Sequence, residues 1–138
     1  DYPGEVAELF EVIQQGLIRK TEITAEYSPA DVFYFIENTS TSLISPAQYR
    51  RYCFNHIMDY ARIIKGADGE LILHMCGFLK DLLPDLNKIP VTAFEAFTSP
   101  PVGNTRFQDG RSQCPDKCII GGTNAVLWTR KSEEIIAE

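Results

Sequence analysis

The spacing of apolar residues along this 138-residue chain predicts three main helices. From residue 5 to about residue 27, apolar side chains recur every three or four positions, as on one face of an amphipathic helix. The apolar face of this helix is expected to comprise Val6, Leu9, Phe10, Ile13, Leu17 and Ile18. A second helix is predicted at 46–65, where Ser45 and Gln48 have the spacing of a capping box. A shorter third helix is expected at 78–86.

Short apolar runs between and after these helices predict four β-strands, at 32–37, 71–77, 91–95 and 117–122. The first run is aromatic and β-branched and is apolar on both faces, which is typical of a parallel strand covered by helices. A long polar connection at 97–116 is expected to hold one short helix after Asn104. This alternation of strands and helices predicts an α/β fold with a parallel sheet, either open or part of a barrel.

Polar groups lie at the carboxyl ends of all four predicted strands. These groups are Glu37 and Asn38, His74 and Cys76, Glu95, and Thr123 and Asn124. In α/β barrels the functional site is built at this end of the strands. A complete barrel needs about 250 residues. Residues 1–138 are therefore expected to form one partial-barrel domain of about four strand–helix units, as a fragment of a longer chain.

The strongest candidate chemistry lies at the end of the second strand. His74 and Cys76 are two residues apart, so strand geometry places their side chains on the same face. A histidine nitrogen and a cysteine thiolate are typical zinc ligands. The alternative is a hydrogen-bonded core histidine beside a cysteine that acts as a small buried hydrophobe. Cys114 and Cys118 have a C-x-x-x-C spacing, but no second pair accompanies them, so free thiols are favoured.

Composition narrows the possible partners and the compartment. The apolar fraction is 44% and the net charge is −6, without a basic cluster. Nucleic acids and anionic membranes both need a positive surface, so neither is expected as a partner. No apolar run approaches the ~20 residues that span a bilayer. Four cysteines are too few for a disulfide scaffold and predict a reducing cytoplasm.

Three segments together resemble the carboxyl-terminal half of the uroporphyrinogen decarboxylase family. They are residues 37–46 (ENTSTSLISP), 74–77 (HMCG) and 121–124 (GGTN). The resemblance covers nearly the whole chain and implies the carboxyl-terminal half of a TIM (β/α)8 barrel. One branch of the family decarboxylates a tetrapyrrole without a cofactor. The other contains cobalamin-dependent methyltransferases that use zinc, and the His-x-Cys-Gly sequence is similar to theirs.

The methyltransferase resemblance implies roles for individual residues. His74 and Cys76 would be zinc ligands, with a further cysteine ligand outside this chain, since Cys118 begins a strand rather than ending one. Zinc would activate a thiol that exchanges a methyl group with a corrinoid carried by a partner protein. Glu37 is the preferred catalytic carboxylate, as a ligand of the resting zinc or as a hydrogen-bond partner of His74. Glu95 is the second candidate for the same role.

Two other readings stay open. In the cofactor-free decarboxylase reading, Asn38 and Asn124 would bind the carboxylates or pyrrole nitrogens of a tetrapyrrole. The expected substrate-binding residues are Asn38, Glu95 and Asn124. The third reading is a fragment without activity of its own. Half a barrel leaves sheet edges and an apolar face uncovered, which predicts a homodimer or higher oligomer.

Overall fold

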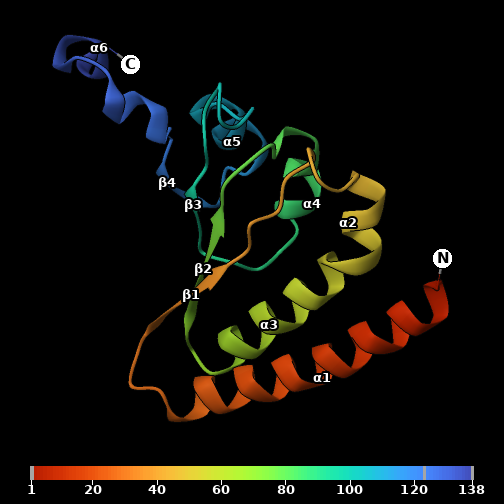
Figure 1. Ribbon diagram of the computed structural model, residues 1–138. Helices are drawn as coiled ribbons and strands as arrows, with labels where there is room; N and C mark the ends of the chain where they lie inside the picture. The colour runs from red at the N-terminus through yellow and green to blue at the C-terminus, as the bar shows by residue number, and fades with distance from the viewer. Residues whose placement is uncertain (1, 123, 138) are drawn as a thin grey trace.

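The computed structural model describes residues 2–122 and 124–137. Its elements are, in order, α1 (Pro3–Tyr27), β1 (Val32–Ile36), α2 (Pro46–Tyr52), α3 (Phe54–Gly66), β2 (Glu70–Met75), η1 (Lys80–Leu82), α4 (Leu83–Leu86), β3 (Ala93–Ala96), α5 (Phe107–Gln113), β4 (Cys118–Gly121), η2 (Ala125–Thr129) and α6 (Ser132–Ile136). The strands form one parallel sheet in the order β1-β2-β3-β4 (Figure 1). The predicted α/β fold with four parallel strand–helix units is confirmed, and the sheet is open, as in half of a (β/α)8 barrel.

The two faces of the sheet differ in burial. Leu71, Leu73 and Met75 of β2 point toward the helices and are at most 2% exposed. The opposite side of the sheet, here called the open face, carries Tyr34, Ile36, His74, Glu95 and Ile120. Ile36, His74, Glu95 and Ile120 lie level with one another in the strand register. The open face therefore carries polar groups and partly exposed apolar side chains.

Helix α3 covers the buried face of the sheet. Ile57, Tyr60, Ala61 and Ile64 recur at helical spacing along α3, and all four are buried in the core. The predicted single helix at 46–65 is interrupted at Cys53, where φ is −118° and ψ is −44°, so it forms α2 and α3 instead. The predicted helix at 78–86 forms a 3-10 turn followed by α4. Pro84, which suits a first helical turn, lies at the start of α4.

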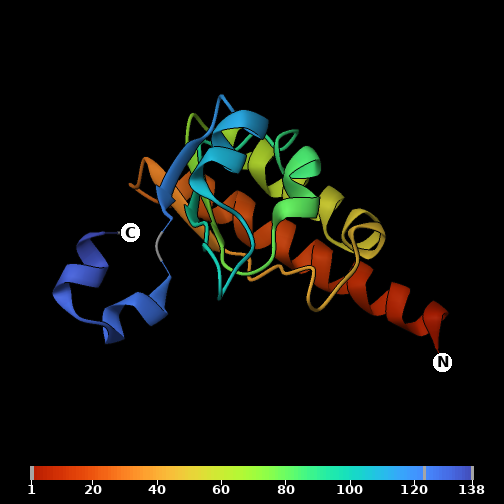
Figure 2. The same ribbon diagram turned by 90° about the horizontal axis from the view of Figure 1, so that it is seen from above.

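Helix α1 packs beside α3, as both views show, but only partly through its predicted apolar stripe (Figures 1 and 2). Its buried residues are Gln14 and Thr21, and the Tyr60 hydroxyl of α3 donates a hydrogen bond to the Gln14 side chain. Leu9 is 56% exposed and Ile13 is 48% exposed. The helix was predicted correctly, but its apolar face only in part. Ile18 packs against the core, whereas Leu9 and Ile13 stay largely exposed, because α3 contacts the side of α1 that carries Gln14 and Thr21.

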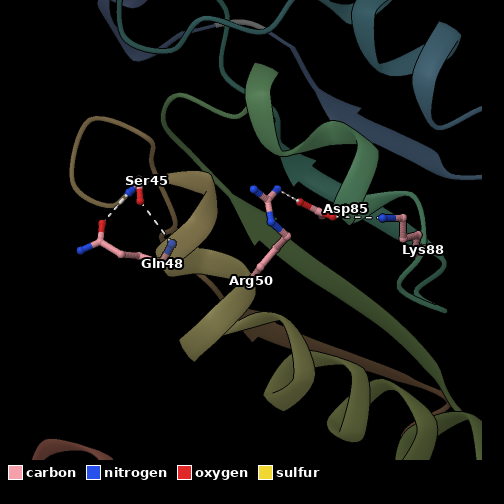
Figure 3. Close-up of polar contacts among 5 residues, drawn as sticks. All are labelled: Ser45, Gln48, Arg50, Asp85 and Lys88. Atoms are coloured by element: carbon pink, nitrogen blue, oxygen red, sulfur yellow. Dashed lines mark hydrogen bonds and ion pairs between the residues drawn. The ribbon is translucent and has the colours of Figure 1, made fainter. Parts of the chain in front are cut away.

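Polar contacts fix the start of α2 and connect it to α4 (Figure 3). The Ser45 hydroxyl accepts a hydrogen bond from the Gln48 backbone N–H at 3.2 Å, and the Gln48 side chain accepts from the Ser45 backbone N–H at 2.8 Å. This is the predicted capping box. Arg50 of α2 and Lys88 donate to opposite oxygens of Asp85 at 2.8 and 3.1 Å. Asp85 is 5% exposed, so it joins α2 to α4 at the edge of the core.

The carboxyl-terminal segment stands apart from the sheet. In both views α6 lies away from β1 and β2, and it contributes no buried residue (Figures 1 and 2). Across residues 2–122 and 124–137, no helix is both long enough and apolar enough to cross a membrane.

Candidate functional site

His74 and Cys76 lie at the carboxyl end of β2, on the open face. The His74 side chain is 24% exposed, and Cys76 is also partly exposed. Neither residue is part of the hydrophobic core, so the alternative of a core histidine beside a buried cysteine does not describe them. Directly after them, Gly77 has φ of +116°, and a Cβ there would lie 2.7 Å from the Cβ of Ser40. Glycine is required at this position for the chain to turn away and leave both side chains accessible.

The His74 ring is held by side chains from both neighbouring strands. Its Nδ1 atom lies 2.5 Å from Oε2 of Glu95 on β3 and 2.9 Å from the Tyr34 hydroxyl on β1. The Tyr34 hydroxyl also donates a hydrogen bond to Glu95 Oε2 at 2.5 Å. Three strands thus each contribute one member of a hydrogen-bonded Tyr34–His74–Glu95 cluster. All of these contacts engage Nδ1, and within residues 2–122 and 124–137 the Nε2 atom of His74 has no hydrogen-bond partner.

The charges within this cluster are set by its hydrogen bonds. The hydrogen bond from Tyr34, with that from His74, holds the pKa of Glu95 below its usual value against the opposing effect of burial. The same hydrogen bond to Glu95 is the main cause that raises the pKa of Tyr34 to about 12. Glu95 is therefore a carboxylate and Tyr34 a neutral phenol at neutral pH. An anionic acceptor beside Nδ1 favours the His74 tautomer that is protonated at Nδ1.

Asn38 is the hydrogen-bond partner of the Cys76 thiol. The Cys76 Sγ–H donates to Asn38 Oδ1 at 3.3 Å. Asn38 is the second residue after β1 and is exposed. The two ends of β1 and β2 therefore place an amide beside the thiol, on the same edge of the sheet as the Tyr34–His74–Glu95 cluster.

Glu37, predicted as the catalytic carboxylate, lies on the other side of the sheet. Ile36 is level with His74 in the register, so the next side chain along β1 points toward the helices. Glu37 accepts a hydrogen bond from the Thr39 hydroxyl at 2.5 Å. Burial raises the pKa of Tyr49, Cys53 and Tyr60 on α2 and α3, and the negative charge of Glu37 adds to each shift. The carboxylate beside His74 is Glu95, the second choice from the sequence.

Asn124, predicted to bind substrate, uses its side chain within the fold. Its amide nitrogen donates to the Ser99 hydroxyl at 3.3 Å and to the Pro100 carbonyl at 2.9 Å. Its amide oxygen accepts from the Val126 backbone N–H at 3.1 Å and so caps η2. With 2% exposure, Asn124 offers no free polar atom to a substrate. It instead connects the long loop after β3 to η2. Thr123, named with it from the sequence, lies outside the described residues.

Comparison with known proteins identifies the family of the chain. The sequence model described as Uroporphyrinogen decarboxylase (URO-D) matches residues 1–138. The chain belongs to the uroporphyrinogen decarboxylase family. A solved structure, a methyltransferase from Methanosarcina mazei, is similar with a TM-score of 0.61 and 17% sequence identity. The similarity covers 77% of this chain and 31% of the methyltransferase, and at this identity it shows a shared fold. Among curated proteins, no match was found.

The donor atoms of this family member fit zinc by type, but the described residues supply only two of them. A catalytic zinc site usually has three protein ligands. In the described part of the chain, no group of three or more His, Cys, Asp or Glu side chains is placed to hold a metal ion. Cys118 is level with Ala93 in the register, and Ala93 is level with Ile72. Cys118 therefore lies nearer the amino ends of the strands than His74 does. It is a free thiol. Any further ligand has to come from outside the described residues.

Tyr34 is the member of the cluster that sequence reasoning missed. It lies in the middle of an aromatic strand, where it is expected as a packing residue. Period-two alternation places it on the same face of β1 as Ile36. Its contact with His74, however, depends on the pairing of β1 with β2, in which Ile36 is level with His74. Only that pairing could have identified Tyr34 beforehand.

Proposed function

We propose that this chain carries part of a zinc site used to transfer a methyl group between a corrinoid protein and a thiol. The observation that carries the proposal is the state of the His74 ring, whose Nδ1 atom lies 2.5 Å from Glu95 Oε2, so that Nε2 is the ring nitrogen left for a metal. A histidine that donates Nδ1–H to a carboxylate and binds metal through Nε2 is a recurrent arrangement in zinc proteins. The fold shared with a methyltransferase supports the same assignment.

Each residue of the site has a separate task in this proposal. His74, through Nε2, and Cys76, as the thiolate, would hold the metal. Glu95 orients the His74 ring and makes Nε2 a stronger electron-pair donor to the metal. In the metal-free chain, Asn38 positions the Cys76 thiol by accepting its S–H at 3.3 Å. Zinc, when bound, lowers the pKa of a coordinated thiol and so supplies a thiolate nucleophile at neutral pH.

Cofactor-free decarboxylation of a tetrapyrrole is the second candidate, and the family match favours it. In this reading His74 and Cys76 would hold no metal. The exposed Asn38 would contact a carboxylate or a pyrrole nitrogen of the substrate at the carboxyl ends of the strands. Asn124, the other expected contact, is already bonded within the fold, which weakens this candidate.

Metal binding by a matched pair of double variants tests the proposal. His74→Ala/Cys76→Ala removes the two proposed ligands. His56→Ala/Cys118→Ala removes the same residue types elsewhere and serves as the control. Each chain is titrated with Co²⁺ in the presence of a small thiol, which supplies further ligands, and Zn²⁺ competition gives the affinity. We expect the wild type and the control to bind with a thiolate-to-cobalt absorption band that the first variant lacks.

Two outcomes of the metal titration would contradict the zinc proposal. They are equal metal binding by all three chains and no binding by the wild type. Binding of a porphyrinogen analogue by the metal-free wild type, weakened by Asn38→Ala, would then favour decarboxylation.

A further inference from the structure

The Tyr34 hydroxyl lies where hydrogen bonds of the cluster converge. It reaches from β1 across β2 to Glu95 of β3 at 2.5 Å, and passes 2.9 Å from His74 Nδ1. The phenol ring meets the imidazole edge-on, with centroids 6.1 Å apart and an interplanar angle of 61°. Tyr34 thus contacts both the proposed metal ligand and the carboxylate that orients it.

Counting protons within the cluster fixes the direction of each hydrogen bond. The Tyr34 hydroxyl has one proton, and it is donated to Glu95 Oε2. Toward His74 Nδ1, the Tyr34 oxygen can therefore only accept. Glu95 Oε2 also lies 2.5 Å from Nδ1 and, as a carboxylate oxygen, can only accept as well. Nδ1 faces two acceptors, so it carries the proton, and in the neutral ring Nε2 is the atom with the lone pair.

Tyr34 also restrains Glu95. The Glu95 side chain is 31% exposed, so without a second partner its carboxylate could rotate toward solvent. The hydrogen bond from Tyr34 ends on the same oxygen, Oε2, that accepts from His74. It holds that oxygen in the position that His74 Nδ1 needs. Removing the hydroxyl would therefore take away an acceptor for Nδ1 and loosen the remaining one.

We propose that Tyr34 is a positioning residue, which fixes the His74 ring as the Nδ1–H tautomer with Nε2 directed to a metal ion. Tyr34 acts through His74 and Glu95 and touches no reacting atom. This inference rests on the proposed zinc function for its purpose, but its effect on the ring is a property of the metal-free chain. The two can therefore be measured separately.

The test compares Tyr34→Phe with Tyr27→Phe. Both substitutions remove one phenol oxygen, but Tyr27 is 73% exposed and has no part in the site. Nitrogen-15 NMR of the metal-free proteins reads the tautomer of His74 directly, and His56 is the internal reference. We expect one Nδ1–H tautomer in the wild type and in Tyr27→Phe, and a mixture in Tyr34→Phe. Glu95→Gln, which replaces the carboxylate with an amide, should shift the ring further toward the other tautomer.

Metal affinity provides the second readout. Loss of an outer partner of a metal-binding histidine typically weakens affinity about 10- to 100-fold. We expect a weakening of this size for Co²⁺ in Tyr34→Phe and none in Tyr27→Phe. An unchanged His74 tautomer in Tyr34→Phe would overturn the role of Tyr34, even if metal binds. A changed tautomer in a chain that binds no metal would support the action of Tyr34 on the ring and overturn the zinc function.

Discussion

The contact between α2 and α4 through Asp85 allows a quantitative prediction about stability. Asp85→Asn keeps the shape of the side chain but removes the charge that Arg50 and Lys88 both contact (Figure 3). Asp85 is buried, whereas the side chains of Arg50 and Lys88 are 53% and 63% exposed. After the substitution both cations can therefore be hydrated, and neither is left as a buried unpaired charge.

The expected loss follows from these exposures. A hydrogen bond to a charged group contributes about 1.5–3 kcal/mol when it is shielded from water, and an exposed ion pair contributes about 0.2–1 kcal/mol. The pair with Lys88, three residues away on the surface, belongs to the lower range. The contribution of the pair with Arg50 lies between the two ranges. A neutral Asn also costs less free energy to bury than the charged Asp85 carboxylate, which offsets part of the loss. We therefore expect Asp85→Asn to lower the free energy of unfolding by about 1–2 kcal/mol.

Urea unfolding at neutral pH measures this loss. For a small domain the slope is about 1–3 kcal/mol per molar, so at a slope of about 2 the midpoint should fall by roughly 0.5–1 M. The control is Asp81→Asn, because Asp81 is exposed on η1 and makes no side-chain hydrogen bond or ion pair with the other described residues. Equal midpoints for Asp85→Asn and Asp81→Asn would refute the assigned contribution of Asp85.

The pH dependence provides an independent check on the same residue. Burial alone raises the pKa of Asp85, but hydrogen bonds from Arg50 and Lys88 outweigh it and hold the pKa below the usual range. A lowered folded-state pKa stabilises the fold above the unfolded-state value, about 3.9 for Asp, and this contribution is lost as the pH falls further. The stability gap between wild type and Asp85→Asn should be constant from neutral pH to about pH 5 and close below about pH 3.9. A gap that closes above that range would assign the effect to another group.

Two further predictions concern backbone geometry. Ser45→Ala removes the cap of α2 and should lower the free energy of unfolding by about 1 kcal/mol in urea; a loss near zero would mean that the capping box contributes nothing. Gly103→Ala would place a Cβ 2.0 Å from the Thr98 carbonyl oxygen, so the loop must shift, at a cost of about 1–3 kcal/mol. Its matched control, Gly16→Ala on α1, meets no atom within 4 Å and should instead gain up to about 1 kcal/mol; the same sign for both would contradict the steric argument.

The sequence was sufficient for the order of the elements but not for the packing of α1. The spacing of apolar residues in α1 identifies a helix, and the stripe through Leu9 and Ile13 shows which side of that helix is most apolar. Which side is buried depends on the neighbour, and in the described structure that neighbour is α3, which contacts the side with Gln14 and Thr21. Local periodicity carries no information about neighbours that are distant along the chain. The capping box at Ser45, by contrast, involves residues three apart and was predicted correctly.

The candidate site shows the same division between local and long-range information. His74 and Cys76 share a face because they lie two apart on one strand, so the sequence alone places them together. The choice between Glu37 and Glu95 depends instead on how β1 and β3 align with β2. Both carboxylates lie at the ends of predicted strands, so the sequence alone does not distinguish them. The observed register sets Ile36 level with His74, and so directs Glu37 to the helices and Glu95 to the open face.

Register therefore determines the chemistry of the site as well as the packing of the sheet. A shift of β1 by one residue would exchange its two faces and bring Phe33, Phe35 and Glu37 to the open face in place of Tyr34 and Ile36. The same shift would remove the Tyr34 hydroxyl from His74 and expose Phe33, which is 7% exposed in the core. Burial of the core side chains thus opposes this one-residue shift, in which the Tyr34–His74–Glu95 cluster could not form. The hydrophobic face of the sheet holds the polar cluster in place on its opposite side.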